Sequence, residues 1–229
     1  MALFSIGDLH LSFAAEKQMD VFEGWADYAA RLDKKWRERV SKDDVVVLPG
    51  DLSWAMRLDE AKEDFAFVES LPGKKIILKG NHDYWWTTKA KLENWFSDNS
   101  FSTISILSNN SYAYGEYAIA GTRGWQLDPD DEKSLKVYRR EANRLRLSLN
   151  DAKAREPREI LVFLHYPPVF AFYTQTEIIE ILQEFGVKRC YYGHVHGSSI
   201  AYAVNREAFG ICFKLVSADY LRFSPYRIL

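Results

Sequence analysis

The first hundred residues alternate short apolar runs with longer amphipathic segments. Three apolar runs have the length of buried strands, at residues 2–6, 44–50 and 74–80. Apolar side chains recur every three or four residues, as on one face of a helix, at 22–40, 57–71 and 88–97. Strands that alternate with helices in this way predict β-α-β units and a parallel sheet covered by helices.

The middle of the chain has a different pattern. Residues 102–121 indicate short strands joined by turns, and a long, highly charged helix is expected over 131–154. The alternation then returns as a strand, a helix and a strand near residues 159–166, 175–185 and 188–197. Residues 199–217 are expected to form two antiparallel strands around an Asn-Arg-Glu turn. Because no linker-like segment interrupts this order, we expect a single domain over residues 1–229.

Composition and charge narrow the class of protein. The chain is 47% hydrophobic and 27% charged, as in soluble globular proteins, and its net charge is only −2. This charge offers no general attraction for nucleic acid or anionic membranes, and no apolar run is long enough for a membrane span. The N-terminal residues lack the basic region of a signal peptide, and Cys190 and Cys212 are expected to be reduced core thiols. We therefore expect a cytoplasmic protein that contacts no membrane and does not act on nucleic acid.

Every histidine of the chain comes directly after an apolar, strand-like run. The histidines occur in four motifs, GDLHLS (7–12), GNHDYW (80–85), LHYPP (164–168) and GHVHG (193–197). Asp8 and Asn81 lie in the first two motifs, and Asp51 lies in GDLSWA (50–55) after another such run. Because the carboxyl ends of parallel strands meet at one edge of a sheet, we expect these side chains to share one crevice.

The residue types in these motifs indicate a metal site. Taken alone, each motif has an ordinary explanation, such as a capping aspartate, a turn or a core histidine. Their joint placement at strand ends favours metal ligation. Imidazole suits Zn, Fe, Ni or Cu, and carboxylate or amide oxygen suits Mn or Mg. The set exceeds the four ligands that one ion commonly takes from a protein, which argues for two ions that share a carboxylate.

The order D-x-H, G-D, G-N-H-D, H and G-H-x-H resembles that of the calcineurin-like metallophosphoesterase superfamily, and especially its small bacterial phosphohydrolases. The resemblance spans almost the whole chain. It implies an α/β fold, a four-layer α/β/β/α sandwich with mixed sheets. It also implies a hydrolase of phosphate monoesters or diesters that uses a metal-bridging hydroxide on a small phosphorylated substrate.

The resemblance also implies a role for each motif residue. The first divalent ion is held by Asp8, His10 and His196. The second is held by Asn81, His165 and His194, and Asp51 bridges the two ions. His82 faces the substrate and serves its leaving oxygen, while Asp83 orients the His82 ring. Mn²⁺ is the expected metal, with Fe, Zn, Ni and Mg as alternatives.

Two further segments bear on the substrate. Protein Ser/Thr phosphatases of this superfamily carry an Asp-Arg pair where this chain has Trp54 and Ala55, so a phosphoprotein substrate is not expected. Arg123 has two interpretations, as a fork that binds phosphate or as a solvated surface arginine. Residues 122–154 are a candidate cap over the site.

Three alternative functions fit the same motifs less well. A nuclease is expected to have a basic groove and usually an added domain, and a lipid-nucleotide pyrophosphatase is expected to have an apolar cap. An inactive scaffold that binds partner proteins is expected to have lost several ligands, and every motif residue is present here.

Overall fold

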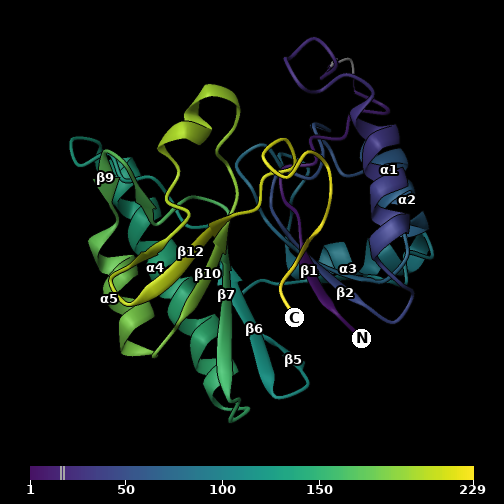
Figure 1. Cartoon of the computed structure of the whole chain (residues 1–229). Coiled ribbons are helices and arrows are strands. Elements are labelled where there is room, and N and C mark those ends of the chain that lie inside the picture. Colours follow the sequence, from purple (N-terminus) through teal and green to yellow (C-terminus); the bar gives the residue numbers. More distant parts are fainter. Residues whose placement is uncertain (16, 18) are drawn as a thin grey trace.

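The computed structural model describes residues 1–15, 17 and 19–229. Two mixed sheets pack face to face at the centre of the molecule, and helices cover both outer faces (Figure 1). This arrangement is the four-layer α/β/β/α sandwich that the motif order implies, so the predicted fold class is confirmed.

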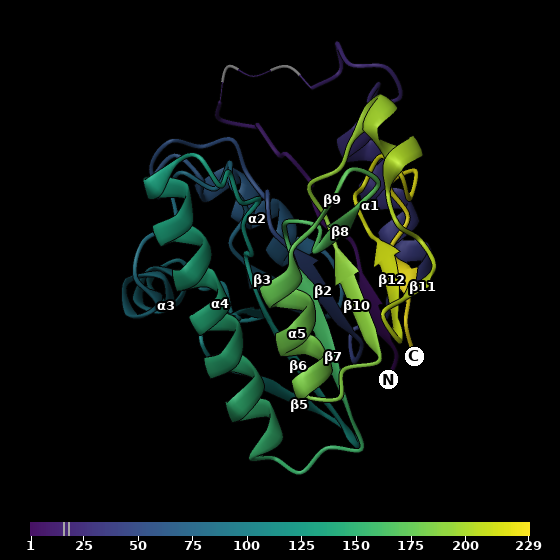
Figure 2. The ribbon, with the colours of Figure 1, turned by 90° about the vertical axis from the view of Figure 1, so that its left-hand side faces the viewer.

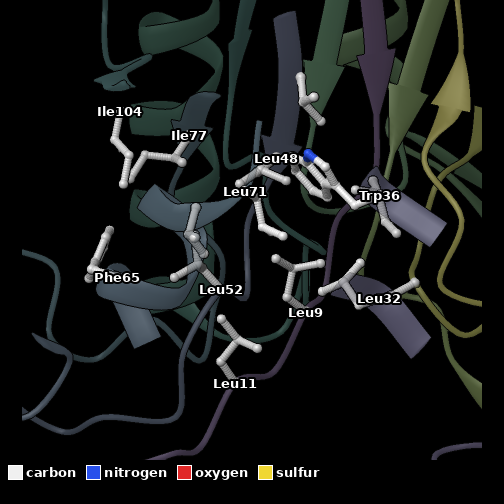
Figure 3. Packing of buried hydrophobic residues seen from close by; sticks show 14 of the residues in the cluster. Leu9, Leu11, Leu32, Trp36, Leu48, Leu52, Phe65, Leu71, Ile77 and Ile104 are labelled. Carbon is white, nitrogen blue, oxygen red and sulfur yellow. The ribbon is translucent and has the colours of Figure 1, made fainter. Parts of the chain in front are cut away.

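The first sheet has the strand order β13-β1-β2-β3-β4, and all its pairs are parallel except β13 with β1. Its strands are β1 (Leu3–Ser5), β2 (Val45–Pro49), β3 (Lys74–Leu78), β4 (Ile104–Ile106) and β13 (Tyr226–Arg227). Its outer face is covered by α1 (Tyr28–Arg39), α2 (Lys62–Ser70) and α3 (Lys89–Asp98). Figure 3 shows this packing, in which Trp36 of α1 lies close to Leu48 of β2, and Leu32 of α1 lies beside Leu9.

The second sheet has the order β11-β12-β10-β7-β6-β5. Its strands are β5 (Tyr112–Tyr114), β6 (Tyr117–Thr122), β7 (Glu159–Leu164), β10 (Arg189–Tyr192), β11 (Glu207–Ala208) and β12 (Ile211–Leu215). The long helix α4 (Glu132–Lys153) and α5 (Thr176–Glu184) cover its outer face (Figure 2). A small hairpin, β8 (Val169–Phe170) with β9 (Tyr173–Thr174), and a 3-10 helix, η1 (Gly197–Tyr202), lie near the carboxyl ends of these strands.

The inner faces of the sheets share an apolar core. Val47 and Ile76 from the first sheet pack with Leu161 and Phe163 from the second. Main-chain bonds also join the sheets just past the strand ends. The Gly7 N–H donates to the Val216 carbonyl at 2.8 Å, and the Ala218 N–H donates to the Gly7 carbonyl at 3.0 Å. The carboxyl ends of the parallel strands therefore meet along one edge.

Several local predictions differ from the structure. The first helix begins at Tyr28 instead of near Phe22, whose side chain is exposed. Residues 197–202 form η1 instead of a strand, and the hairpin of β11 and β12 turns at Phe209 and Gly210. Cys212 is exposed and so is not a core thiol.

The segment 122–154 is not a cap as a whole. Its helix α4 packs along β6 and β7 as part of an outer layer, because its small and apolar residues form one buried face. Only the loop before it borders the site described below.

A separate question is membrane insertion. Within the described ranges 1–15, 17 and 19–229, no helix has both the length and the apolar character needed to cross a bilayer.

Candidate metal centre

The motif residues lie on loops that follow β1, β2, β3, β7 and β10. Four of them have left-handed backbone conformations, with φ of 58° at Asp8, 47° at His10, 50° at Asp51 and 72° at His194. A non-glycine residue in this region costs roughly 1–2 kcal/mol, and such strain gathers at functional sites. The turns redirect the side chains from the sheet faces toward the shared edge.

Glycines let these loops touch. A Cβ atom on Gly50, where φ is +90°, would lie 2.7 Å from both the Gly80 Cα and the His165 Nδ1. A Cβ atom on Gly80 would overlap the Asp51 Oδ1. Both positions therefore need glycine, because any larger residue would push the loop after β2 away from its neighbours.

One group of ligand-type atoms comes from Asp8, His10 and His196. These atoms all lie within 4.8 Å of one another, close enough to bind a single metal ion. The Nε2 atoms of His10 and His196 are 3.3 Å apart, and the Asp8 Oδ1 is 3.6 Å from the His196 Nε2. Asp8 and His10 are buried. Two imidazole nitrogens and a carboxylate oxygen that converge in this way suit a divalent cation.

A second group comes from Asp51, His165 and His194, and Asn81 lies beside it. The Asn81 Oδ1 is 2.6 Å from the His165 Nε2 and 2.8 Å from the His194 Nδ1. The other ring nitrogen of His165 lies 3.1 Å from the Pro49 carbonyl. A ring held by its Nδ1–H in this way turns the Nε2 lone pair toward the centre, as second-layer contacts of metal-binding histidines do.

Asp51 lies between the two groups. Its Oδ2 is 3.8 Å from the His10 Nε2 in the first group and 3.5 Å from the His165 Nε2 in the second. Its Oδ1 accepts a hydrogen bond of 2.7 Å from the His82 backbone N–H. The structure thus gathers the seven sequence-predicted ligands at one place, with Asp51 in the position of a shared ligand. Metal binding by these side chains stays a prediction.

Burial keeps three of the imidazoles neutral. It lowers the pKa of His165 to about 3 and the pKa of His194 to about 4, and it lowers the pKa of His10 well below its usual value. Only a neutral imidazole has the lone pair that a metal ion needs. These three rings are therefore ready to act as ligands at neutral pH.

His196 differs because a carboxylate outside the motifs contacts it. Burial by itself would lower the pKa of His196, but hydrogen bonding to Asp219 and the charge of Asp8 outweigh it and raise this pKa to about 10. The Asp219 Oδ1 is 3.0 Å from the His196 Nδ1, so Asp219 orients the ring. Sequence reasoning missed Asp219, which lies in SADY shortly after β12. Its place after a strand at the same edge was the available signal.

The buried carboxylates also favour a cation. Burial would raise the pKa of Asp8, but His196, His165 and His10 outweigh it and lower this pKa below the ordinary value. Burial, followed by the charges of Asp83 and Asp8, raises the pKa of Asp51 well above its ordinary value. A divalent cation beside Asp51 would offset that penalty. The donor set and its electrostatics therefore fit bound metal ions.

Asp83 does not orient the His82 ring as predicted. Its buried carboxylate instead accepts backbone N–H bonds from Gly80 at 2.7 Å, Asp51 at 3.0 Å and Leu52 at 2.9 Å, with a longer one from Ser53. The backbone N–H groups that follow β2 and β3 supply several hydrogen-bond donors, whereas the His82 ring could supply only one. This explains why the carboxylate binds the backbone. Asp83 is thus a structural anchor of the loops that carry Asp51 and His82.

His82 lies at the open side of the centre and outside both ligand groups. Its Nδ1 is 3.2 Å from the Tyr84 hydroxyl, and the centroid of its ring is 4.3 Å from that of the Trp54 ring. Trp54 also stacks on His10, with ring centroids 4.9 Å apart. This position suits a group that meets a substrate, and that role stays a prediction.

Arg123 is not a solvated surface residue. Its side chain is 14% exposed, and its Nη2 lies 3.6 Å from a carboxylate oxygen of Glu141 on α4. The guanidinium faces a separate cavity that it shares with Lys79 and Arg144. Arg123 therefore lies beside the metal centre, on a neighbouring part of the same edge.

With this geometry in place, comparison with known families identifies the class of the protein. The calcineurin-like phosphoesterase family model matches residues 1–198, and the chain belongs to that family. The protein is a metal-dependent phosphoesterase, as the motif order predicts. The family implies divalent metal ions, and the two side-chain groups described above are the candidates to hold them.

Solved structures share the fold at low sequence identity. A protein of unknown function from Aquifex aeolicus is 17% identical, with a TM-score of 0.52 over 99% of this chain and 95% of that one. Phosphopantetheinyl hydrolase from Mycobacterium tuberculosis is 15% identical, with a TM-score of 0.55 over 100% and 95% of the two chains. The protein TT1561 of Thermus thermophilus is 10% identical, with a TM-score of 0.56 over 85% and 81%. A comparison with curated proteins gave no match.

The anchoring role of Asp83 leads to a first prediction. In Asp83→Asn, an amide NH₂ replaces one acceptor oxygen and faces two backbone N–H donors, so the variant should lose about 3 kcal/mol of unfolding free energy. It should also bind Mn²⁺ at least about tenfold more weakly, because Asp51 moves with its loop. Urea unfolding and calorimetry measure the two effects. Asp59→Asn, at a side chain 72% exposed, is the control and should match the wild type. Equal stability of the two variants would contradict the anchoring role.

Asp219 gives a second prediction, about pH. The pKa of His196 is raised to about 10, so a metal ion must displace its proton at lower pH. Mn²⁺ affinity should therefore rise with pH, by about tenfold per unit for each proton released. Asp219→Asn keeps a hydrogen-bond acceptor but removes the charge, which lowers the pKa of His196. Its affinity should rise less steeply between about pH 7 and pH 9. Calorimetric titration at several pH values tests this, and identical slopes would refute the assignment.

Proposed function

We propose that the protein hydrolyses a small phosphate ester with two divalent metal ions, Mn²⁺ being the expected metal. One ion would be held by Asp8, His10 and His196, and the other by Asn81, His165 and His194, with Asp51 shared. The observation that carries this proposal is the position of the Asp51 Oδ2, which lies within 4 Å of an imidazole nitrogen from each group, at 3.8 Å and 3.5 Å.

The protein residues supply orientation and charge. Bound divalent ions would polarise the phosphoryl group and lower the pKa of water, so that hydrolysis proceeds near neutral pH. Pro49 and Asp219 fix the rings of His165 and His196 through their Nδ1 atoms. The carboxylates of Asp8 and Asp51 supply negative charge that binds the ions, and the surrounding burial limits solvent screening.

His82 would serve the leaving oxygen. When the Tyr84 hydroxyl donates to the His82 Nδ1, the proton of the neutral ring is on Nε2. Burial lowers the pKa of His82, so the ring is neutral at pH 7 and acts as a hydrogen-bond donor. An Nε2–H beside the departing oxygen stabilises the charge that develops there.

Hollows beside the centre have room for a small substrate. One, of about 490 Å³, is lined by Trp125, Gln126 and Tyr166 together with His194. Another, of about 340 Å³, shares Gln126 and His194 and extends over the aromatic rings of the β8–β9 hairpin. Their volumes match those of small-molecule sites, which are roughly 300–1,000 Å³. The loop before α4, and not the helix, would therefore shape the entry of the substrate.

One assay tests the proposed function. Metal-stripped protein is titrated with Mn²⁺ and assayed on p-nitrophenyl phosphate and on its bis ester. Activity should return as about two ions bind per chain, and the ratio of the two rates assigns the monoester or diester preference. Tight metal binding without activity on either ester would instead favour the inactive scaffold.

His82 provides a further prediction. His82→Ala should bind Mn²⁺ as the wild type does, since its ring lies outside both ligand groups. Its kcat should fall by about 10²–10⁴-fold, the usual contribution of such a group. His165→Ala is the matched control and should lose metal and activity together. Equal loss of metal in both variants would show that His82 is a ligand instead.

A further inference from the structure

A cavity of about 500 Å³ lies beside the metal centre and has an unbalanced positive charge. Its lining includes Lys79, Lys89, Arg123 and Arg144 but only one carboxylate, that of Glu141. Lys89 has a neighbour of opposite charge in Glu93, at 3.8 Å. Glu141 is therefore the only carboxylate of the lining that could offset the charges of Lys79, Arg123 and Arg144.

Glu141 does not satisfy all of these donors. Its carboxylate already accepts a bond of 2.8 Å from the Arg144 Nη1 and one of 2.7 Å from the Thr122 hydroxyl. The Arg123 Nη2 remains at 3.6 Å, and the buried Arg123 Nε has no acceptor among the residues that the structure describes. The Lys79 ammonium, which also lines the cavity, has no hydrogen-bonding or ion-pair partner among the residues that the structure describes. A buried guanidinium nitrogen without an acceptor, beside a half-buried lysine without a partner, favours an anion in the cavity.

The cavity lies on the same edge as the metal centre. Lys79 follows β3 and comes two residues before Asn81, while the Arg123 carbonyl accepts the backbone N–H of His165 at 3.1 Å. At this side the first sheet continues from β3 to β4, and the second continues from β7 to β6 and then to β5. Residues after β4 and β6 line the cavity, so it begins about one strand spacing, roughly 5 Å, beyond the ligand loops.

The start of α3 also faces this cavity. Thr88, the N-cap residue, and Lys89, the first helical residue, are part of the lining. The positive end of the dipole of this ten-residue helix therefore adds to the charge of Lys79, Arg123 and Arg144.

We propose that this cavity binds a second anionic group of the substrate, a phosphate or a group of similar charge, roughly 5–10 Å from the ester that is cleaved. The inference rests on the proposed function, because it names the class of substrate for the same centre. Lys79, Arg123 and Arg144 are the specificity-determining residues. A substrate with two phosphate groups would span the metal centre and the cavity.

The activity test uses matched pairs of substrates. Ethanediol, butanediol and hexanediol bisphosphates are compared with the corresponding alkyl monophosphates on the Mn²⁺-loaded protein. At least one bisphosphate should have a kcat/KM about tenfold or more above its monophosphate, the advantage of one charge-assisted contact. Lys79→Gln and Arg144→Gln should each lower this ratio by about tenfold. Arg139→Gln, an exposed α4 residue outside the cavity lining, should leave the ratio unchanged.

A binding test separates this proposal from the proposed function. Calorimetry with metal-free protein and inorganic phosphate should show binding that Lys79→Gln and Arg144→Gln weaken and Arg139→Gln does not. If no ester is hydrolysed, this titration still decides whether the cavity binds anions. Thermal melts check that each variant is folded. The proposal is overturned if hydrolysed bisphosphates have no advantage over monophosphates, if that advantage survives both substitutions, or if phosphate binding is absent or is unchanged by both substitutions.

Discussion

The hydrogen bonds of one buried carboxylate hold the metal centre in place. Asp83 accepts backbone N–H groups from both the loop after β2 and the loop after β3. The loop after β2 in turn pairs with the loop after β1, through bonds such as the His10 N–H to the Asp51 carbonyl at 3.0 Å. Asp8 then reaches across to the second sheet, where its carboxylate accepts the His194 N–H at 3.0 Å. A continuous set of backbone and carboxylate bonds therefore fixes ligand-type residues from distant parts of the chain.

This framework gathers groups that do not stabilise one another well. The neutral imidazoles of His10 and His165 are buried with the carboxylates of Asp8 and Asp51, and His194 is half-buried. The pKa of Asp51 is raised by its burial and its acidic neighbours. Left-handed backbone conformations at the strand ends add local strain. The large apolar cores on either side of each sheet supply the stability that this arrangement needs. Bound divalent cations would offset the repulsion among the buried carboxylates, because each cation is attracted to the same negative charges. Cation binding would therefore stabilise the folded protein.

The sequence predicted those features that local chemistry repeats. Apolar runs followed by glycine, aspartate or histidine marked the parallel strands and placed the seven ligand-type residues at one edge. Features that depend on tertiary contacts were missed. Asp219 has no flanking glycine and acquires its role only because β12 lies beside β10. Residues 199–204 have the apolar content of a strand but form much of η1, and β12 pairs instead with β10 and β11. The periodicity of α4 indicated a helix but not which surface its apolar face would cover.

The ligand loops and the loops that line the cationic cavity follow different strands of each sheet. The ligand loops follow strands whose neighbours are fixed on both sides, so changes there disturb several hydrogen bonds at once. The loops after β4 and β6 lie one strand farther out, and the loop after β6 contacts the ligand loops through its backbone, where the Arg123 carbonyl accepts the His165 N–H at 3.1 Å. In the proposed anion site, the side chains of Lys79, Arg123 and Arg144 would select what binds beside the metal centre, while backbone hydrogen bonds hold the ligand loops. The loop before α4 would have the same role on the side of His194. Under the proposal that the cavity binds an anionic group, substrate selection is a property of side chains that border the strand ends and not of the ligand set itself.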